Sequence, residues 1–169
     1  VVISYLRNHA DIWNLGLLLQ FQTGMRIGEI SALKREDIQQ NGTLLVHRTE
    51  VKCKDESGKW TVYVKDTSKT DAGNRTIILP DNAKWTLDEI LKLNMNRGKR
   101  IRENTFNKRL SRVCEELRIE HRTSHKIRKT YGTTLLDCGV NESTVSEQLG
   151  HSDIATTRKY YYFSNKNTE

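Results

Sequence analysis

A chain of 169 residues with 36% hydrophobic content is long enough for one compact domain and too short for two ordinary ones. Lysine and arginine number 28 against 21 acidic residues, and the resulting net charge of +7 favours a polyanionic partner. No apolar run approaches the roughly 20 residues that span a bilayer, and the three cysteines lack disulfide or zinc-ligand spacing, so we expect a protein of the reducing cytosol without a membrane role.

The first predicted element is an almost wholly apolar helix, which we place at the centre of the core. Its apolar residues are Ile12, Leu15, Leu17, Leu18 and Leu19. It ends near Gly24, because glycine readily adopts the left-handed conformation of a helix cap. A short helix follows, and Arg26 falls in its first turn, where backbone N–H groups and the helix dipole favour anions. Arg26 is therefore placed where a phosphate could dock.

Three segments rich in β-branched and aromatic residues predict a small antiparallel sheet. They span residues 43–52, 59–65 and 75–79. The intervening turns, 54–58 and 67–74, contain the glycine and Asx residues that turns need, and Pro80 ends the last segment.

From Asp81 onward the pattern is helical. One helix is amphipathic and basic, with an apolar stripe formed by Phe106, Leu110, Val113, Cys114 and Leu117. Residues 97–122 hold nine basic and four acidic residues, which indicates either a surface for a polyanion or an ordinary solvated helix face.

Three further helices complete the prediction. The first runs from about Ser124 to Cys138, with a buried stripe of Ile127, Tyr131, Thr134, Leu135 and Cys138. The second has Asn141 as its N-cap and Gly150 as its end. Ser152 or Asp153 would cap the last helix. The predicted fold class is α+β, mainly α-helical with a small three-stranded antiparallel sheet.

Several residues could carry chemistry, and each also has an ordinary structural explanation. His125 and Arg128 share a helix face with Gly132, whose missing side chain would let a ligand approach, yet such a face is often merely solvated. Lys69 lies in a turn, where lysine usually serves solubility. His151 follows a helix end and could interact with its last carbonyls.

Tyr160 is one of three adjacent tyrosines at the end of the chain, and aromatic residues there usually pack against the core. Its candidacy as a nucleophile therefore depends on the residues around it in the sequence.

Taken together, four segments resemble tyrosine recombinases of the phage integrase family. Residues 23–30 (TGMRIGEI) are similar to the first arginine box, and residues 68–70 (SKT) with 75–80 (RTIILP) to the lysine hairpin. Residues 124–133 (SHKIRKTYGT) resemble the His-x-x-Arg box, and residues 149–160 (LGHSDIATTRKY) the terminal box. The position of Tyr160 nine residues after His151 in that box favours it over its two neighbours.

The resemblance implies metal-independent DNA cleavage through a covalent 3′-phosphotyrosyl intermediate on Tyr160. Phosphodiester cleavage needs a nucleophile, stabilisation of charge on the non-bridging oxygens and a proton for the leaving oxygen. Arg26 and Arg128 would bind phosphate oxygens, and Lys69 would protonate the leaving 5′ oxygen.

In the same picture His125 and His151 would hydrogen-bond the phosphate and assist proton movement. Glu29, one turn from Arg26, would orient that arginine. No cofactor and no metal is expected.

The family also implies a setting for this chain. We expect double-stranded DNA as partner and a tetramer on DNA for the full-length protein. The recombination would be that of a phage or other mobile element. It would take place in the bacterial cytoplasm, the nucleoid or an infected host. Residues 1–169 would be one catalytic domain, a fragment without its N-terminal DNA-binding domain and monomeric when isolated.

Three other interpretations of the sequence are possible. They are a type IB topoisomerase that relaxes DNA, a catalytically inactive recombinase-derived DNA-binding module, and a basic RNA- or protein-binding domain with accidental motif matches. The four segments in this order favour a site-specific recombinase.

Overall fold

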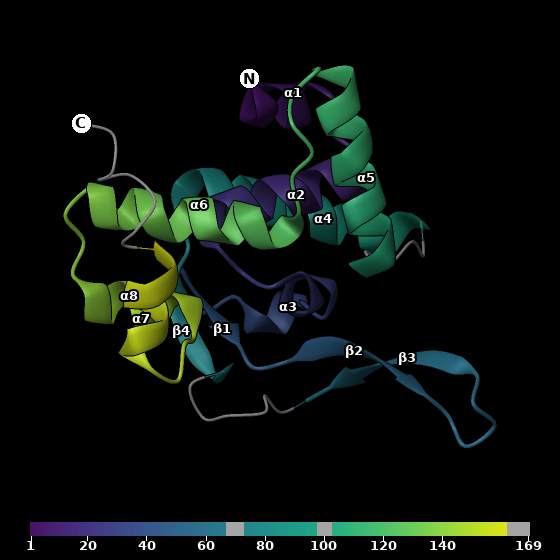
Figure 1. Ribbon diagram of the computed structural model, residues 1–169. Coiled ribbons are helices and arrows are strands. Elements are labelled where there is room, and N and C mark those ends of the chain that lie inside the picture. Colours follow the sequence, from purple (N-terminus) through teal and green to yellow (C-terminus); the bar gives the residue numbers. More distant parts are fainter. Residues whose placement is uncertain (67–72, 98–102, 162–169) are drawn as a thin grey trace.

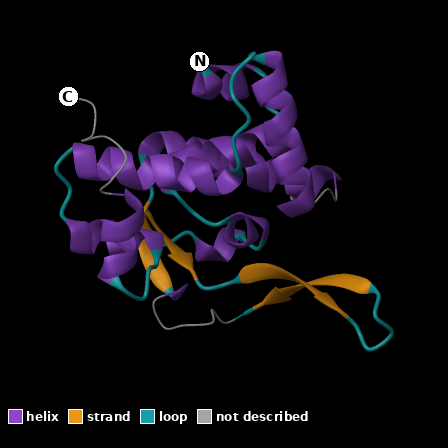
Figure 2. Cartoon of the chain, viewed as in Figure 1, coloured by secondary structure: helices purple, strands orange, loops and turns teal. Residues whose placement is uncertain are grey.

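The computed structural model describes residues 1–66, 73–97 and 103–161, which form helices packed around one central helix and two small antiparallel sheets (Figure 1). Figure 2 shows that helices predominate. The elements in chain order are α1 (Val2–Asn8), α2 (Ile12–Thr23), α3 (Ile27–Ser31), η1 (Arg35–Asp37), β1 (Thr43–Val46), β2 (Thr49–Lys54), β3 (Trp60–Lys65), β4 (Arg75–Ile78), α4 (Asp81–Arg97), α5 (Glu103–Glu116), α6 (Ser124–Asp137), α7 (Glu142–Leu149) and α8 (Ile154–Tyr161). The predicted fold class, α+β and mainly helical, is confirmed.

Helix α2 lies at the centre of the core, as its apolar sequence predicts. Every residue from Leu15 to Gln20 is buried, and the helix packs against α1, α4, α5 and α6. The Asp11 carboxylate caps its first turn by accepting hydrogen bonds from the backbone N–H groups of Trp13 and Asn14. At the other end Gly24 adopts the left-handed conformation, with φ of 65°. The point at which the chain leaves α2 is thus fixed.

The strands form two two-stranded sheets, where the sequence predicts a single three-stranded sheet. β1 pairs with β4, with Thr43 opposite Ile78, and β2 pairs with β3, with Thr49 opposite Lys65. The predicted strand 43–52 is therefore divided into two strands. The β2–β3 pair extends away from the helices as a hairpin (Figure 1).

Buried charges at the break between β1 and β2 account for this change of partner. The side chain of Arg48 is 7% exposed, and it donates to Asp37 Oδ1 at 2.5 Å and to Glu36 Oε1 at 2.8 Å. His47 Nε2 lies 3.1 Å from the same Asp37 oxygen. Because a buried guanidinium is costly without its acceptors, the chain stays anchored to η1 here and the strand beside β4 ends at Val46.

The helices of the second half follow the predicted stripes to different degrees. In α5 the predicted residues Phe106, Leu110, Val113 and Cys114 are all buried. In α6 the buried residues are Ile127, Arg128, Gly132 and Thr133. This face differs from the predicted stripe because α6 packs against α2 on one side and against α7 and α8 on another. Gly132 therefore lies inside the protein and does not open α6 to a ligand.

The caps of the last two helices agree with the sequence. Asn141 Oδ1 accepts from the backbone N–H of Ser143 at 2.8 Å, and Gly150 ends α7 with φ of 66°. Asp153 Oδ1 accepts from the backbone N–H of Ala155 in the first turn of α8. Within the described ranges no helix is long and apolar enough to cross a membrane.

Candidate active site

Hydrogen bonds join four segments at the C-terminal end of α2. They connect the turn after α2, the start of α3, the first half of α6 and the turn between α7 and α8. Three of the four predicted motifs supply these segments. Residues far apart in the sequence therefore meet at one place, around the side chains of Arg26 and Arg128.

Arg128 is the buried centre of this junction. It is 3% exposed, and its Nη1 donates to the carbonyl oxygen of Gly24 at 2.6 Å while its Nη2 donates to that of Leu149. Both carbonyls lie at helix C-terminal ends, which carry partial negative charge. The expectation of a solvated helix face shared with His125 is therefore half right, since His125 is exposed and Arg128 is not.

Arg26 stands at the start of α3, as the sequence predicts. Its side chain is 46% exposed, so it can reach a ligand. Nη1 donates to Glu29 Oε1 at 2.8 Å, and Nη2 donates to the carbonyl oxygen of Gly150 at 3.1 Å. The backbone N–H of Arg26 also donates to Glu29 Oε2 at 2.8 Å, which satisfies an N–H group at the start of α3.

Glu29 accepts hydrogen bonds from Arg26, and it also binds a second arginine. Arg75 donates from Nη1 to Glu29 Oε1 at 3.0 Å and from Nη2 to Oε2 at 2.9 Å. Burial alone would raise the pKa of Glu29, but the hydrogen bonds and charge of Arg75, with the charge of Arg26, lower it to about 2. Glu29 is consequently ionised at neutral pH.

Arg75 is the residue of this cluster that the sequence interpretation did not single out. Its side chain is 6% exposed, and its Nε donates to the carbonyl oxygen of Gln148 in α7 at 2.8 Å. The signal that could have found it is the alternation of β4, in which Arg75 shares the buried face with Ile77. A buried arginine in a strand requires a carboxylate partner.

His151 follows Gly150 and is half-buried. Its Nδ1 lies 2.8 Å from Thr157 Oγ1 in α8. Burial, the largest cause, and the positive charges of Arg128, Arg26 and Arg75 together lower the pKa of His151 to about 4. The imidazole is therefore neutral at neutral pH.

A pocket of about 320 Å³ opens beside the two arginines. It is lined by Gln20, Arg26, Ile27, Gly28, Thr49, Glu50, Ser124, His125 and Arg128. The two guanidinium groups outnumber the single carboxylate of this lining, and His125 adds a hydrogen-bonding ring. Such a lining suits an anion that accepts several hydrogen bonds, as a phosphodiester does. Across the described residues, no group of His, Cys, Asp or Glu side chains could hold a metal ion.

Two predicted site residues lie wholly or partly outside the described part of the chain. Lys69 falls in residues 67–72, outside the described part of the chain. Tyr160 lies in α8, which follows the turn that carries His151, and its side chain is outside the described part.

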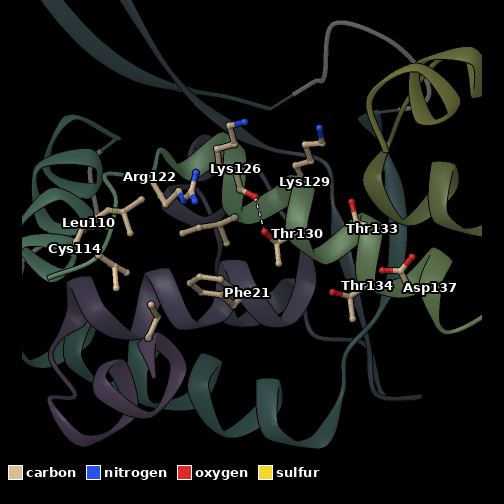
Figure 3. Close-up of a pocket in the computed structure, with 13 residues that line it drawn as sticks. Phe21, Leu110, Cys114, Arg122, Lys126, Lys129, Thr130, Thr133, Thr134 and Asp137 are labelled. Atoms are coloured by element: carbon tan, nitrogen blue, oxygen red, sulfur yellow. Dashed lines mark hydrogen bonds between the residues drawn. The ribbon is translucent and has the colours of Figure 1, made fainter. Parts of the chain in front are cut away.

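A second pocket of about 460 Å³ lies between α2, α5 and α6 (Figure 3). Phe21, Leu110 and Cys114 contribute apolar surface to it, whereas Lys126 and Lys129 reach from α6 away from Phe21. None of the predicted site residues that the structure describes lines this pocket. The candidate active site is therefore the smaller pocket beside Arg26 and Arg128.

Residues 3–167 match the model of the family described as the phage integrase family. Curated relatives include a tyrosine recombinase XerC of Roseiflexus castenholzii, 29% identical over 156 residues, and an integrase of a Staphylococcus phage, 29% identical over 165 residues. These alignments cover 90% and 85% of this chain but 48% and 45% of the relatives. The chain spans about half the length of the curated relatives it matches.

Solved structures share the fold. The integrase of the transposon Tn1549, in complex with circular intermediate DNA, superposes with a TM-score of 0.78 at 19% identity, covering 98% of this chain and 60% of that one. A XerA recombinase superposes with a TM-score of 0.72 at 21% identity, covering 97% of this chain and 57% of that one. At these identities the likeness concerns the fold alone.

Proposed function

The chain belongs to the phage integrase family, and on this premise we propose that it is the catalytic domain of a tyrosine recombinase that cleaves and rejoins DNA strands at specific sites. The observation that carries the proposal is the junction around Arg128. One set of hydrogen bonds brings Arg26 and Arg128 to a single pocket and places His151 close enough for both arginines to lower its pKa.

The two arginines and the two histidines would bind the scissile phosphate. Charge builds up on the non-bridging oxygens as the phosphodiester is attacked, and guanidinium groups in a partly buried site stabilise that charge without a metal ion. Glu29 supports this role by holding the Arg26 guanidinium at 2.8 Å while Arg75 keeps Glu29 ionised.

Tyr160 would be the nucleophile. Its phenolic oxygen attacks phosphorus and forms the 3′-phosphotyrosyl bond, its proton passes to water or to a site histidine, and the bond to the 5′ oxygen breaks. In the proposal Lys69 supplies the proton to that leaving oxygen. A second 5′ hydroxyl then reverses the step and joins a new strand, so the energy of the phosphodiester is kept and no cofactor is consumed.

The partner would be double-stranded DNA. The net charge of +7 favours it, and the structural neighbours include a transposon integrase in complex with circular intermediate DNA and a lambda integrase dimer bound to a core site. Exposed cations such as Lys126 would contact phosphates, and the logarithm of the affinity should fall with log salt by about 0.9 per contact.

The full-length protein would carry a separate N-terminal DNA-binding domain and act as a tetramer on DNA. It would recombine the DNA of a phage or other mobile element, inside the cell that contains this DNA. The chain spans about half the length of its curated relatives, which is compatible with a further domain in the whole protein.

The decisive experiment is covalent trapping on a nicked suicide DNA that carries the cognate site. We expect an adduct with the full-length protein in EDTA, seen on a denaturing gel, and none with Tyr160→Phe. Tyr161→Phe and Tyr162→Phe are the matched controls and should form the adduct. Adduct formation by Tyr160→Phe, or its loss only in one of the controls, would show that another tyrosine is the nucleophile.

The DNA products of the reaction distinguish a recombinase from the other functions that the sequence allows. Strand exchange between two sites supports a recombinase, whereas relaxation of supercoiled DNA without exchange would indicate a topoisomerase. If wild-type protein binds the site and forms no adduct, the chain is a DNA-binding module without activity.

The general acid is tested separately. Lys69→Ala should bind DNA normally and cleave slowly, and a 5′-phosphorothiolate substrate, whose leaving group needs no proton, should restore cleavage. Absence of this rescue would remove the role assigned to Lys69.

A further inference from the structure

Resting on the proposed function, we propose that Thr157 is a positioning residue whose hydroxyl holds the neutral ring of His151 in the tautomer with its proton on Nε2. The starting observation is the 2.8 Å hydrogen bond between Thr157 Oγ1 and His151 Nδ1, which joins the turn after α7 to α8. Thr157 lies three residues before Tyr160 in the same helix.

The direction of this hydrogen bond follows from the surroundings of Thr157. Its side chain is fully buried, with 0% exposure, so the hydroxyl proton cannot go to solvent. In α2, α4 and α6, the hydroxyls of Thr23, Thr86 and Thr130 donate to the carbonyl four residues earlier. Among the residues that the structure describes, the Thr157 hydroxyl instead has His151 Nδ1 as its hydrogen-bond partner.

The hydroxyl of Thr157 must therefore donate, because a buried hydroxyl proton without an acceptor is costly. Nδ1 then accepts and carries no proton. A neutral imidazole has a single ring proton, so that proton lies on Nε2. If Nδ1 donated instead, the Thr157 proton would have no acceptor among the residues that the structure describes.

The ring is neutral, which makes its tautomer consequential. Burial and the surrounding arginines keep the pKa of His151 at about 4, so at neutral pH the ring presents one donor and one acceptor instead of two donors. A neutral Nε2–H can donate to a phosphate oxygen, whereas a bare Nε2 would repel it. Thr157 thus determines whether His151 can serve as a donor in the proposed site.

The backbone of His151 is held independently of Thr157. Its N–H donates to the carbonyl oxygen of Ser146 at 3.0 Å, directly after the left-handed Gly150. Loss of the Thr157 hydroxyl should therefore change the proton position on the ring without releasing the residue from its turn.

The test is nitrogen NMR of protein labelled with ¹⁵N in histidine, at neutral pH and without DNA, since ring-nitrogen shifts report which nitrogen carries the proton. The sequence has five histidines, and a His151→Gln variant identifies the signal. We expect the proton on Nε2 in the wild type and in Thr157→Ser, and a mixture of tautomers in Thr157→Val. Thr156→Val, one position earlier in α8, is the matched control and should match the wild type.

Cleavage gives the second readout. Adduct formation on suicide DNA should slow roughly two- to tenfold in Thr157→Val, the factor that corresponds to one net hydrogen bond, and recover in Thr157→Ser. A wild-type His151 protonated on Nδ1, or an unchanged tautomer in Thr157→Val, would overturn the proposal. Because the tautomer is read without DNA, a wild type that forms no adduct would count against the proposed function and leave the tautomer result intact.

Discussion

Glu29 and Arg75 form a buried bidentate ion pair between α3 and β4, with N–O distances of 3.0 and 2.9 Å. The same carboxylate accepts a hydrogen bond from Arg26 at 2.8 Å. The most exposed cation of the candidate site is thus oriented by a carboxylate whose own position is fixed from the strand side. Arg75 in turn reaches the end of α7, so one chain of contacts spans three elements.

Replacing Glu29 with glutamine should destabilise the fold. The variant keeps the shape but leaves Arg75 buried without its counter-charge, and removing one partner of a buried pair typically costs about 3–5 kcal/mol. Urea unfolding measures the loss. Glu89→Gln removes the carboxylate of a partly exposed surface pair with Lys92 and should leave the free energy of unfolding nearly unchanged. Equal stability of the two variants would mean that the buried pair contributes nothing.

Helix ends in this protein are predictable from the sequence because they depend on local chemistry. Gly24 and Gly150 adopt the expected left-handed caps, and Asn141 caps α7 as expected. The pairing of the strands is not predictable in the same way. It depends on the buried contact between Arg48 and Asp37, which joins two segments through tertiary structure.

In the candidate site, too, some features are predictable from the sequence and others depend on tertiary contacts. Motif order is sufficient to predict that Arg26, Arg128 and His151 meet, and the structure brings them to one junction. Arg75 escapes prediction because its function depends on a partner 46 positions away in the sequence. The burial of Arg128 is also not predictable from the sequence, since helical periodicity cannot show that α7 and α8 cover that face of α6. The catalytic roles of all the predicted site residues, Lys69 and Tyr160 among them, stay predictions.

Gly24→Ala should be much more harmful than an alanine at another left-handed glycine. A Cβ at Gly24 would lie 2.3 Å from Tyr131 Cδ1, whereas one at Gly139 would meet nothing within 4 Å. Both variants incur the left-handed strain of about 1–2 kcal/mol, and only Gly24→Ala adds overpacking of about 1–3 kcal/mol. Urea unfolding of the pair isolates the steric part. Equal losses would show that Tyr131 moves aside without cost.

Arg128→Lys should lose both stability and activity. A lysine is a point charge and cannot present a planar fork to the carbonyls of Gly24 and Leu149 together. We expect a loss of about 1.5–3 kcal/mol in the free energy of unfolding, the usual value for a hydrogen bond to a charged group. Adduct formation should fall about 100-fold or more, as when a donor to a developing oxyanion is removed.

The matched control for Arg128→Lys is Arg158→Lys. Arg158 is 65% exposed and pairs with Glu142 at 2.7 Å, so its replacement should leave both measurements near the wild-type values. If Arg128→Lys behaved like Arg158→Lys, the two carbonyl contacts of Arg128 would have no energetic role.

The stability of the fold should decrease as the pH falls from about 6.5 to about 4, and His151 is one cause. Burial and the nearby arginines lower its pKa from 6.5 to about 4 in the folded state. Between these values the unfolded chain binds the proton and the folded chain does not, so the free energy of unfolding rises with pH in this window. Below the folded pKa both states are protonated and the contribution of His151 levels off.

His151→Asn removes the titrating ring and should therefore show a shallower dependence of urea midpoint on pH between 4 and 6.5 than the wild type. Ser152→Ala, at the next position and without a titrating group, should keep the wild-type slope. An unchanged slope in His151→Asn would mean that the ring is protonated in the folded protein as readily as in the unfolded chain, and that burial and the arginine cluster do not hold it neutral.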